Sequence, residues 1–261
     1  MVEEVKENFE LLTEIATDLS MQFDGINTDC RRKKVSTHYL AKLVHTCWSL
    51  NKLLPLSKED FLDFPSIAAV CRNIIELTNL CWYYCIENVS ELESEFRFLL
   101  YDFHDVTALN AIFNKLSFEL DEPQKLDQEK EGLKSLLMKH QQFDILSEED
   151  KKQVKKGRKA TLLNHFQIIE NRGINVDYFH GIYKLMSTHT HSTATSVNLV
   201  VNARFHSSEM DEAFLGLTIH YTSGFIAEMI LEIGSMWNID FAKSESKEFI
   251  EFHASQLYAD I

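Results

Sequence analysis

One stretch of the chain, residues 65–88, decides the fold, and it reads PSIAAVCRNIIELTNLCWYYCIEN. Pro65 suits the first turn of a helix, because the N–H that proline lacks would have no partner there. Apolar side chains would cover most of the circumference of this helix, which is typical of a helix buried in a core. They are Ile67, Val70, Cys71, Ile74, Ile75, Leu77, Leu80, Cys81, Trp82, Cys85 and Ile86. We therefore predict a buried helix over this stretch.

The window 66–86 within this stretch is the most apolar of the chain and is long enough to span a membrane. It contains Arg72, Asn73, Glu76 and Asn79, however, and a charge at the centre of a bilayer costs about 3 kcal/mol. We therefore expect no membrane segment here and interpret the window as part of a helical bundle.

A polar stripe runs along the same helix. Arg72, Glu76 and Asn79 are spaced i, i+4 and i+7, which places them on one face, and Tyr83 extends the line. Charged side chains on an apolar helix either face water in a cleft or pair with buried partners, because an unpaired buried charge is too costly. Two interpretations remain open: an ion pair that tethers neighbouring helices, or one wall of a polar pocket.

The rest of the chain also favours helices. Glycine and proline number only 8 and 3 among 261 residues, too few for the turns of sandwiches, barrels or Rossmann-type folds. Helical spacing of apolar residues predicts further helices at 2–23, 35–54, 91–120, 159–171, 178–188, 195–205, 211–237 and 246–258. We predict an all-α fold in which residues 1–261 form a single helical bundle.

Residues 121–157 differ from their surroundings, because they are rich in charge and contain Pro123. Ser147 is a good N-cap for a short helix, acidic residues follow it, and Gly157 closes the segment. We predict a charged excursion from the bundle, either a lid or a long surface connection.

Charge and cysteine content restrict the partners and the compartment. The chain has 26 Lys and Arg against 40 Asp and Glu, a net charge of −14 that opposes broad binding to nucleic acids or anionic membranes. Two basic clusters, residues 31–34 and 151–159, would be the first candidates for contacts with RNA phosphates. The start of the chain shows no signal peptide, and the five cysteines form no CxxC pair, so we expect a cytoplasmic protein.

Histidines and hydroxyl side chains gather in the second half of the chain. Tyr183, Ser187 and His191 are spaced i, i+4 and i+8 and would share one face of a continuous helix. The decapeptide 187–196 contains seven Ser or Thr, however, and such residues favour a break in the helix. We therefore predict a polar site at a bend between apolar helices.

A metal site is the weaker interpretation of these histidines. His189 and His191 could offer imidazoles, with Glu76 or Glu228 as carboxylate, but the chain has neither an HExxH motif nor paired ExxH motifs. We predict no metal and no other cofactor.

Two motifs, Arg72-x-x-x-Glu76 and Tyr183-x-x-x-Ser187-x-x-x-His191-Ser192, resemble those of an uncharacterised family of all-helical bacterial proteins over roughly residues 65–236. The chain is also distantly similar to the HEPN superfamily, helical bundles that include metal-independent ribonucleases of toxin and antiviral systems. Those enzymes use an Arg and a following His, often paired across a dimer. Arg72-Asn73 matches the opening of that motif, but no His follows at 77–79. Similar spacings occur elsewhere, at Arg32…His38, Arg97…His104 and Arg158…His165. A ribonuclease would need either Arg97 with His104, which share a predicted helix, or a composite of Arg72 with His191.

The resemblance implies a ribonuclease-like effector of bacterial defence, with RNA or a nucleotide as ligand and a second copy of the chain as a candidate partner. In this hypothesis His191 takes the proton of a ribose hydroxyl and Arg72 stabilises the charge on phosphorus. The catalytic residues would be Arg72, Glu76 and His191, and the binding residues Asn79, Tyr183, Ser187 and Ser192. The alternatives are a non-catalytic module whose acidic surface binds a basic protein, and a metal-dependent hydrolase or oxidase that uses His189, His191 and a Glu.

Overall fold

The computed structural model describes residues 2–57, 60–116, 123–191, 193–202, 209–239 and 245–259. Within these ranges the regular structure is entirely helical, which confirms the all-α prediction. The chain divides into two compact units, one of residues 1–86 and 165–261 and one of residues 87–164. The predicted excursion at 121–157 falls in the second unit, which also contains the long helix before it. That the two units fold as a single domain stays a prediction.

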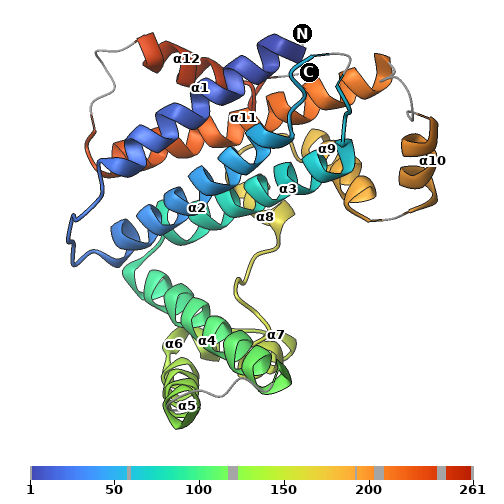
Figure 1. Cartoon of the computed structure of the whole chain (residues 1–261). Helices are drawn as coiled ribbons and strands as arrows, with labels where there is room; N and C mark the ends of the chain where they lie inside the picture. The colour runs from blue at the N-terminus through green and yellow to red at the C-terminus, as the bar shows by residue number, and fades with distance from the viewer. Residues whose placement is uncertain are drawn as a thin grey trace. The chain divides into compact units, whose positions relative to one another are not determined.

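The first unit is a bundle built around α3 and α11 (Figure 1). Its described helices are α1 (Val2–Met21), α2 (Arg31–Leu53), α3 (Phe64–Cys81), the π-helix η1 (Trp82–Ile86), α8 (His165–Asn171), α9 (Val176–Thr190), α10 (Ala194–Asn202), α11 (Glu209–Met236) and α12 (Glu245–Ser255).

The helix predicted over 65–88 forms, in two parts. Asp63 caps its start by accepting a hydrogen bond from Ser66 N at 3.2 Å, and Pro65 occupies the first turn. The apolar side chains of α3 are buried against α2, α9 and α11. At Trp82 the helix changes from α to π geometry, which the apolar pattern does not reveal because both geometries keep these side chains inside.

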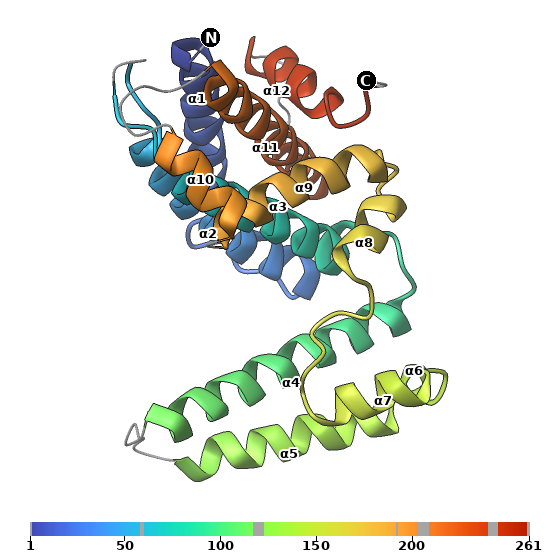
Figure 2. The same ribbon diagram turned by 90° about the vertical axis from the view of Figure 1, so that its right-hand side faces the viewer.

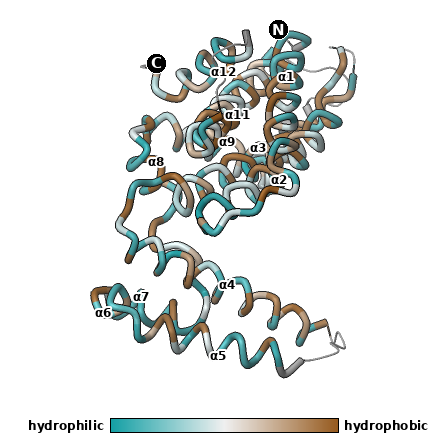
Figure 3. The backbone as a smooth tube through the Cα atoms, turned by 90° about the vertical axis from the view of Figure 1, so that its left-hand side faces the viewer, coloured by the Kyte–Doolittle hydropathy of each residue, from teal (hydrophilic) through white to brown (hydrophobic). Residues whose placement is uncertain are grey.

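Helix α11 is buried around most of its circumference and packs against α1, α3 and α12 (Figure 2). Among the described helices it is the one long and apolar enough to cross a membrane by length and composition, with a mean hydropathy of 1.3. In the structure 72% of the most apolar 18-residue stretch of α11 is buried, as in the core helix of a bundle. The stretch 66–86, which the sequence singled out, is therefore not the most membrane-like helix. In Figure 3 hydrophobic residues are concentrated where α1 and α11 meet the neighbouring helices.

The second unit has a core of its own. It comprises α4 (Glu91–Leu116), α5 (Pro123–Lys139), α6 (Gln141–Asp144) and α7 (Glu148–Lys155), and α4 and α5 run side by side (Figure 2). Its buried apolar residues are Phe96, Leu100, Phe103, Leu137, Phe143 and Val154. The predicted short helix is confirmed as α7, because Ser147 Oγ accepts a hydrogen bond from Asp150 N at 3.1 Å and Gly157 follows with a φ of +65°.

Two helices start four or more residues away from their predicted starts. Helix α2 begins at Arg31, four residues before the predicted start, so the basic run 31–34 forms its first turn. Helix α8 begins at His165, six residues after the predicted start at 159. In both places the apolar spacing alone could not locate the first turn, where caps decide the boundary.

Candidate active site

Two of the predicted site elements meet in the first unit. Arg72 Nε donates hydrogen bonds to Glu76 Oε1 at 2.8 Å and to the hydroxyl of Tyr183 at 3.1 Å. The Tyr183 hydroxyl in turn donates to the same Glu76 oxygen at 2.6 Å. The side chains of Arg72 and Glu76 remain 26% and 29% exposed, so the group is partly open to solvent. We call Arg72, Glu76, Tyr183 and the adjacent His165 the Arg72 cluster.

Of the two alternatives left open by the sequence, the ion pair that tethers helices is observed, whereas the wall of a polar pocket stays a prediction. Arg72 and Glu76 form the ion pair within α3, and through Tyr183 that pair also joins α3 to α9. Among the described residues Arg72 makes its hydrogen bonds through Nε alone, which leaves the N–H groups of both terminal nitrogens to solvent or to a ligand. A guanidinium held in this way presents a fixed, positively charged fork.

The cluster fixes the protonation states of Arg72 and Tyr183. Burial lowers the pKa of Arg72, but the hydrogen bonds to Glu76 and Tyr183 and the charge of Glu76 outweigh it and the pKa rises. Burial, followed by the hydrogen bond to Glu76, raises the pKa of Tyr183 to about 12. Near pH 7 the arginine is therefore charged and the tyrosine is protonated.

Aromatic packing holds the tyrosine in place. The Phe179 ring stacks on the Tyr183 ring with centroids 5.3 Å apart, and Phe166 meets it edge-on at 6.0 Å. On the remaining side the Arg72 guanidinium carbon lies 4.7 Å from the centroid of the tyrosine ring, within range of a cation–π interaction. The hydroxyl that orients Arg72 is thus set by a packed ring.

His165 is the member that the sequence did not place here. It begins α8, and its ring centroid lies 6.3 Å from that of Tyr183. Burial lowers its pKa, with Glu76 opposing and Arg72 reinforcing the effect, so the imidazole is neutral near pH 7. Its Nδ1 is buried without a hydrogen-bond partner, whereas Nε2 is not among the buried atoms. From its spacing, His165 was matched only with Arg158. Spacing cannot reveal that Arg72, 93 residues earlier in the chain, is its neighbour.

The histidine predicted as the base is not part of the cluster. His191 is exposed, ends α9 as its C-cap, and uses its backbone N–H to bond Ser187 O at 3.3 Å. It follows Tyr183 by eight residues, which is about 12 Å along a helix axis. The hydrogen bonds of Arg72 go to Glu76 and Tyr183 and not to His191, and the composite of Arg72 with His191 stays a prediction.

The remaining predicted binding residues are also separate from the cluster. Ser187 Oγ donates to Tyr183 O at 2.6 Å, a local helix contact. The predicted break in the Ser/Thr-rich segment is confirmed, since α9 ends at Thr190. Ser192 lies outside the described residues.

Asn79 belongs to a second polar group, deeper in the bundle. It is fully buried and its Oδ1 accepts a hydrogen bond from Arg172 Nη1 at 2.6 Å. Arg172 Nη2 also pairs with Glu228, which in turn accepts a hydrogen bond from Tyr258. Asn79 does share a helix face with Arg72, but it lies seven residues along, about 10 Å further into the core. We call Asn79, Arg172, Glu228, Tyr258 and the adjacent Glu232 the Arg172 network.

The Arg172 network is strongly desolvated. The Arg172 side chain is 1% exposed and that of Glu228 is 12% exposed. Burial raises the pKa of Glu232 to about 8, with Glu228 adding to the rise and Arg172 opposing it. Such a group belongs to the stability of the bundle, because neither the guanidinium nor the amide of Asn79 is accessible to a ligand. The sequence missed Arg172, which stands alone after a short helix without a recognisable motif.

Two of the other three Arg/His spacings contain arginines that hold helices in place. Arg97, 4% exposed, lies within 2.5 Å of oxygens of both Glu87 and Glu93, and His104 Nδ1 lies 2.9 Å from Gly157 O. Arg32 Nε donates to Cys85 O at 2.7 Å. These arginines brace helices through their guanidinium groups.

The residues proposed as metal ligands do not gather. His189 is buried, its ring lies edge-on to Phe64 with centroids 4.7 Å apart, and neither ring nitrogen has a hydrogen-bond partner. No group of three or more His, Cys, Asp or Glu side chains suited to a metal occurs in the part of the chain that the structure describes.

Comparison with known proteins gives one match. A family model described as "Family of unknown function (DUF5677)" matches residues 33–211, more than two thirds of the chain. Neither the curated proteins nor the solved structures yield a match. The matched range contains every member of the Arg72 cluster, whereas Glu228 and Tyr258 of the Arg172 network lie beyond it.

Proposed function

The chain belongs to the DUF5677 family, whose function is unknown, and we propose that the Arg72 cluster cleaves RNA without a metal ion. One observation carries the proposal. Arg72 is held by Glu76 and Tyr183 through Nε, so that its terminal nitrogens are left for an anion beside a neutral imidazole. A fixed cation next to a neutral base is the minimum required for cleavage by a neighbouring hydroxyl.

The reaction needs one proton acceptor and one stabilised charge. His165 Nε2 takes the proton of the ribose 2′-hydroxyl, and the resulting oxygen attacks the adjacent phosphorus. The terminal N–H groups of Arg72 donate to the non-bridging phosphate oxygens as negative charge accumulates on them. The bond from phosphorus to the 5′-oxygen breaks, and that oxygen takes the proton back from the imidazolium. The products are a 2′,3′-cyclic phosphate and a 5′-hydroxyl end.

Glu76 and Tyr183 act as positioning residues in this proposal. Each accepts a hydrogen bond from Arg72 Nε, and the Tyr183 hydroxyl also donates one to Glu76. These contacts set the direction of the guanidinium group. The net charge of −14 opposes long-range attraction of RNA. Recognition must therefore be local, which suits a short single-stranded segment better than an extended duplex.

Cleavage of a short RNA in EDTA tests the proposal. Arg72→Ala and His165→Ala should each reduce the rate about 100-fold or more, and Tyr183→Phe should give an intermediate loss. The matched control is His191→Ala, which removes an exposed histidine of the same unit and should leave the rate unchanged. Cyclic phosphate ends on the product, and toxicity on expression that disappears in Arg72→Ala, would support a role as a defence effector.

The pH profile gives a second readout. The base must be neutral, and the pKa of His165 is lowered from 6.5 chiefly by burial. The acid limb of the rate should therefore have its midpoint below 6.5. Loss of activity in the His191 variant, or equal activity in all variants, would overturn the assignment.

A non-catalytic interaction module is the second candidate, and the charge of −14 favours it. Such a module would bind a basic protein with an affinity that falls steeply with salt. Its binding would not respond to Arg72→Ala or His165→Ala, which separates it from the enzyme.

A further inference from the structure

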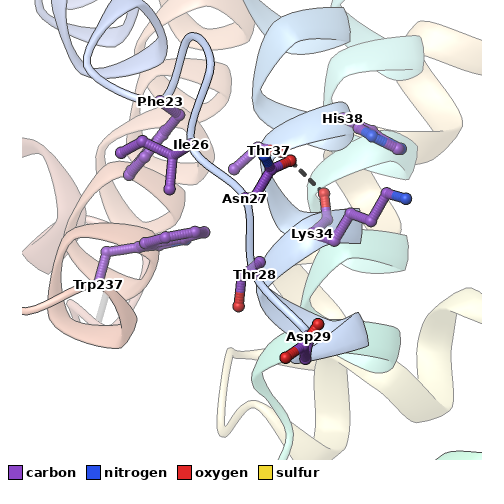
Figure 4. Close-up of a pocket in the computed structure, with 9 residues that line it drawn as sticks. All are labelled: Phe23, Ile26, Asn27, Thr28, Asp29, Lys34, Thr37, His38 and Trp237. Atoms are coloured by element: carbon purple, nitrogen blue, oxygen red, sulfur yellow. Dashed lines mark hydrogen bonds between the residues drawn. The ribbon is translucent and has the colours of Figure 1, made fainter.

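A hollow with a volume of about 550 Å³ lies where the loop between α1 and α2 faces the end of α11 (Figure 4). Its size falls in the range of sites for small molecules. All of its lining residues belong to the first unit. The Arg72 cluster does not contribute to it, since the lining comes from residues 23–38 and from Trp237.

One wall of the hollow is apolar and rigid. The rings of Phe23 and Trp237 lie 4.7 Å apart, and Trp237 Nε1 donates to Ser36 Oγ at 3.3 Å, which fixes the indole. Lys33 Nζ lies 5.1 Å from the Trp237 ring centroid and adds a cation–π contact. Ile26, on the same side of the hollow in Figure 4, is 50% exposed. The apolar side of the hollow is therefore formed by Phe23, Ile26 and the Trp237 indole, with the Lys33 cation at the indole ring.

The opposite wall is polar and carries positive charge. It comes from the first two turns of α2, where Lys34, Thr37 and His38 follow one another along the helix (Figure 4). Thr37 Oγ1 donates to Lys34 O at 2.8 Å, which ties down its hydroxyl and leaves the exposed Lys34 ammonium as the principal donor. This wall suits an anionic group, for which a lysine is a common partner in proteins.

The loop between the two walls supplies further polar groups. Thr28 Oγ1 accepts a hydrogen bond from Cys30 N at 3.2 Å, so its O–H is left to donate. Asp29 lies beside it and can accept hydrogen bonds from hydroxyl groups of a ligand. The first turn of α2 contains four consecutive cations and no acidic residue, the reverse of the usual preference at a helix start. A local rule broken in this way is typical of a functional surface.

We propose that this hollow binds a nucleotide, with the base against Trp237, the sugar hydroxyls at Asp29 and Thr28, and the phosphate at Lys34. Three chemically different walls match the three parts of such a ligand. A simple aromatic molecule would leave the Lys34 wall unused, and inorganic phosphate would leave the Trp237 wall unused. The nucleotide can be free or can belong to a single-stranded RNA, and both sources present the same base and phosphate.

Calorimetric titration of the full chain with AMP, CMP, GMP and UMP tests the proposal. Lys34→Gln should weaken nucleotide binding about tenfold or more, yet leave the affinity for the corresponding nucleoside within twofold. The matched control is Lys42→Gln. It alters an exposed lysine on the same helix whose carbonyl also accepts a threonine hydroxyl at 2.8 Å, and it should change neither affinity.

The aromatic wall needs its own variant. Trp237→Leu should weaken both nucleotide and nucleoside, because apolar contact with the base contributes to each. If that variant does not fold, the comparison of AMP with ribose 5-phosphate in the unaltered chain replaces it, and AMP must bind more tightly. Binding of a short RNA in competition with AMP would identify RNA as the source, whereas binding of AMP without competition would identify a free nucleotide.

Nucleotide binding in this hollow is independent of the cleavage proposal. Arg72→Ala should retain AMP binding, and absence of RNA cleavage by the unaltered chain would not affect this site. Equal effects of Lys34→Gln and Lys42→Gln would overturn the proposal. So would a Kd above about 1 mM for all four nucleotides.

Discussion

Replacement of Arg172 by methionine tests the interpretation of the Arg172 network as a stabilising group. The variant removes a side chain that is 1% exposed, together with its hydrogen bond to Asn79 and its ion pair with Glu228. Removing one partner of a buried pair leaves the other charge uncompensated, which typically costs 3–5 kcal/mol. Glu228 keeps the hydrogen bond from Tyr258, so we expect a loss of free energy of unfolding near the lower end, about 3 kcal/mol.

Urea unfolding followed by tryptophan fluorescence measures this loss cleanly. The three tryptophans, at 48, 82 and 237, all lie in the first unit, so the signal reports the unit that contains the network. Lys184→Met is the matched control, since it removes an exposed cation from α9 and should change stability by less than about 0.5 kcal/mol.

A double variant with Arg172→Met and Glu228→Met completes the test. If the two residues act as a pair, the double variant should be much less destabilised than the sum of the single variants, because no uncompensated charge remains. A loss below about 1 kcal/mol for Arg172→Met, or strict additivity in the double variant, would refute the reasoning.

Three further predictions concern stability. Burial raises the pKa of Glu232 to about 8, so the folded chain retains a proton that the unfolded chain releases near pH 4.5, and this contribution to stability is lost as pH rises from about 5 to 8. Glu232→Gln should remove that loss, and equal pH dependence of variant and wild type in urea titrations would contradict it. Gly224→Ala would bring Cβ to 2.8 Å from a leucine methyl beyond α12 and should cost about 1–3 kcal/mol by urea unfolding, whereas Gly181→Ala, with nothing within 4 Å, should stabilise α9. Gly157→Ala combines a φ of +65° with a threonine oxygen of α4 at 2.5 Å and should lower the thermal midpoint, measured by circular dichroism, more than Gly173→Ala, where only the φ of +74° opposes the change.

The fold was largely predictable because it rests on local patterns. The apolar spacing from Pro65 onward gives a buried helix whatever it packs against, and Ser147 with its acidic successors marks a helix start. Helix α5 was not predicted, because its exposed and charged residues carry no clear apolar stripe.

The candidate site was predictable only where it is local. Arg72 and Glu76 lie one helical turn apart, so spacing alone indicates their pairing. Tyr183 was singled out by its spacing with Ser187 and His191 and by a family resemblance, but its contact with Arg72 spans 111 residues and could not be predicted from either. His165 and Arg172 could not be found by spacing, because tertiary packing of α8 against α3 and α9 determines their neighbours. The periodicity that favoured His191 continues past the end of the helix that carries it.

The π-helical turn at Trp82–Ile86 has a consequence for how this chain can change length. A deletion inside α3 would rotate every later side chain by about 100° and turn the buried face toward solvent. The π turn holds one residue more than an α turn, so losing a residue there restores ordinary helical winding and leaves Arg72 and its neighbours unrotated. We therefore expect relatives one residue shorter in this region to have lost it at the wide turn.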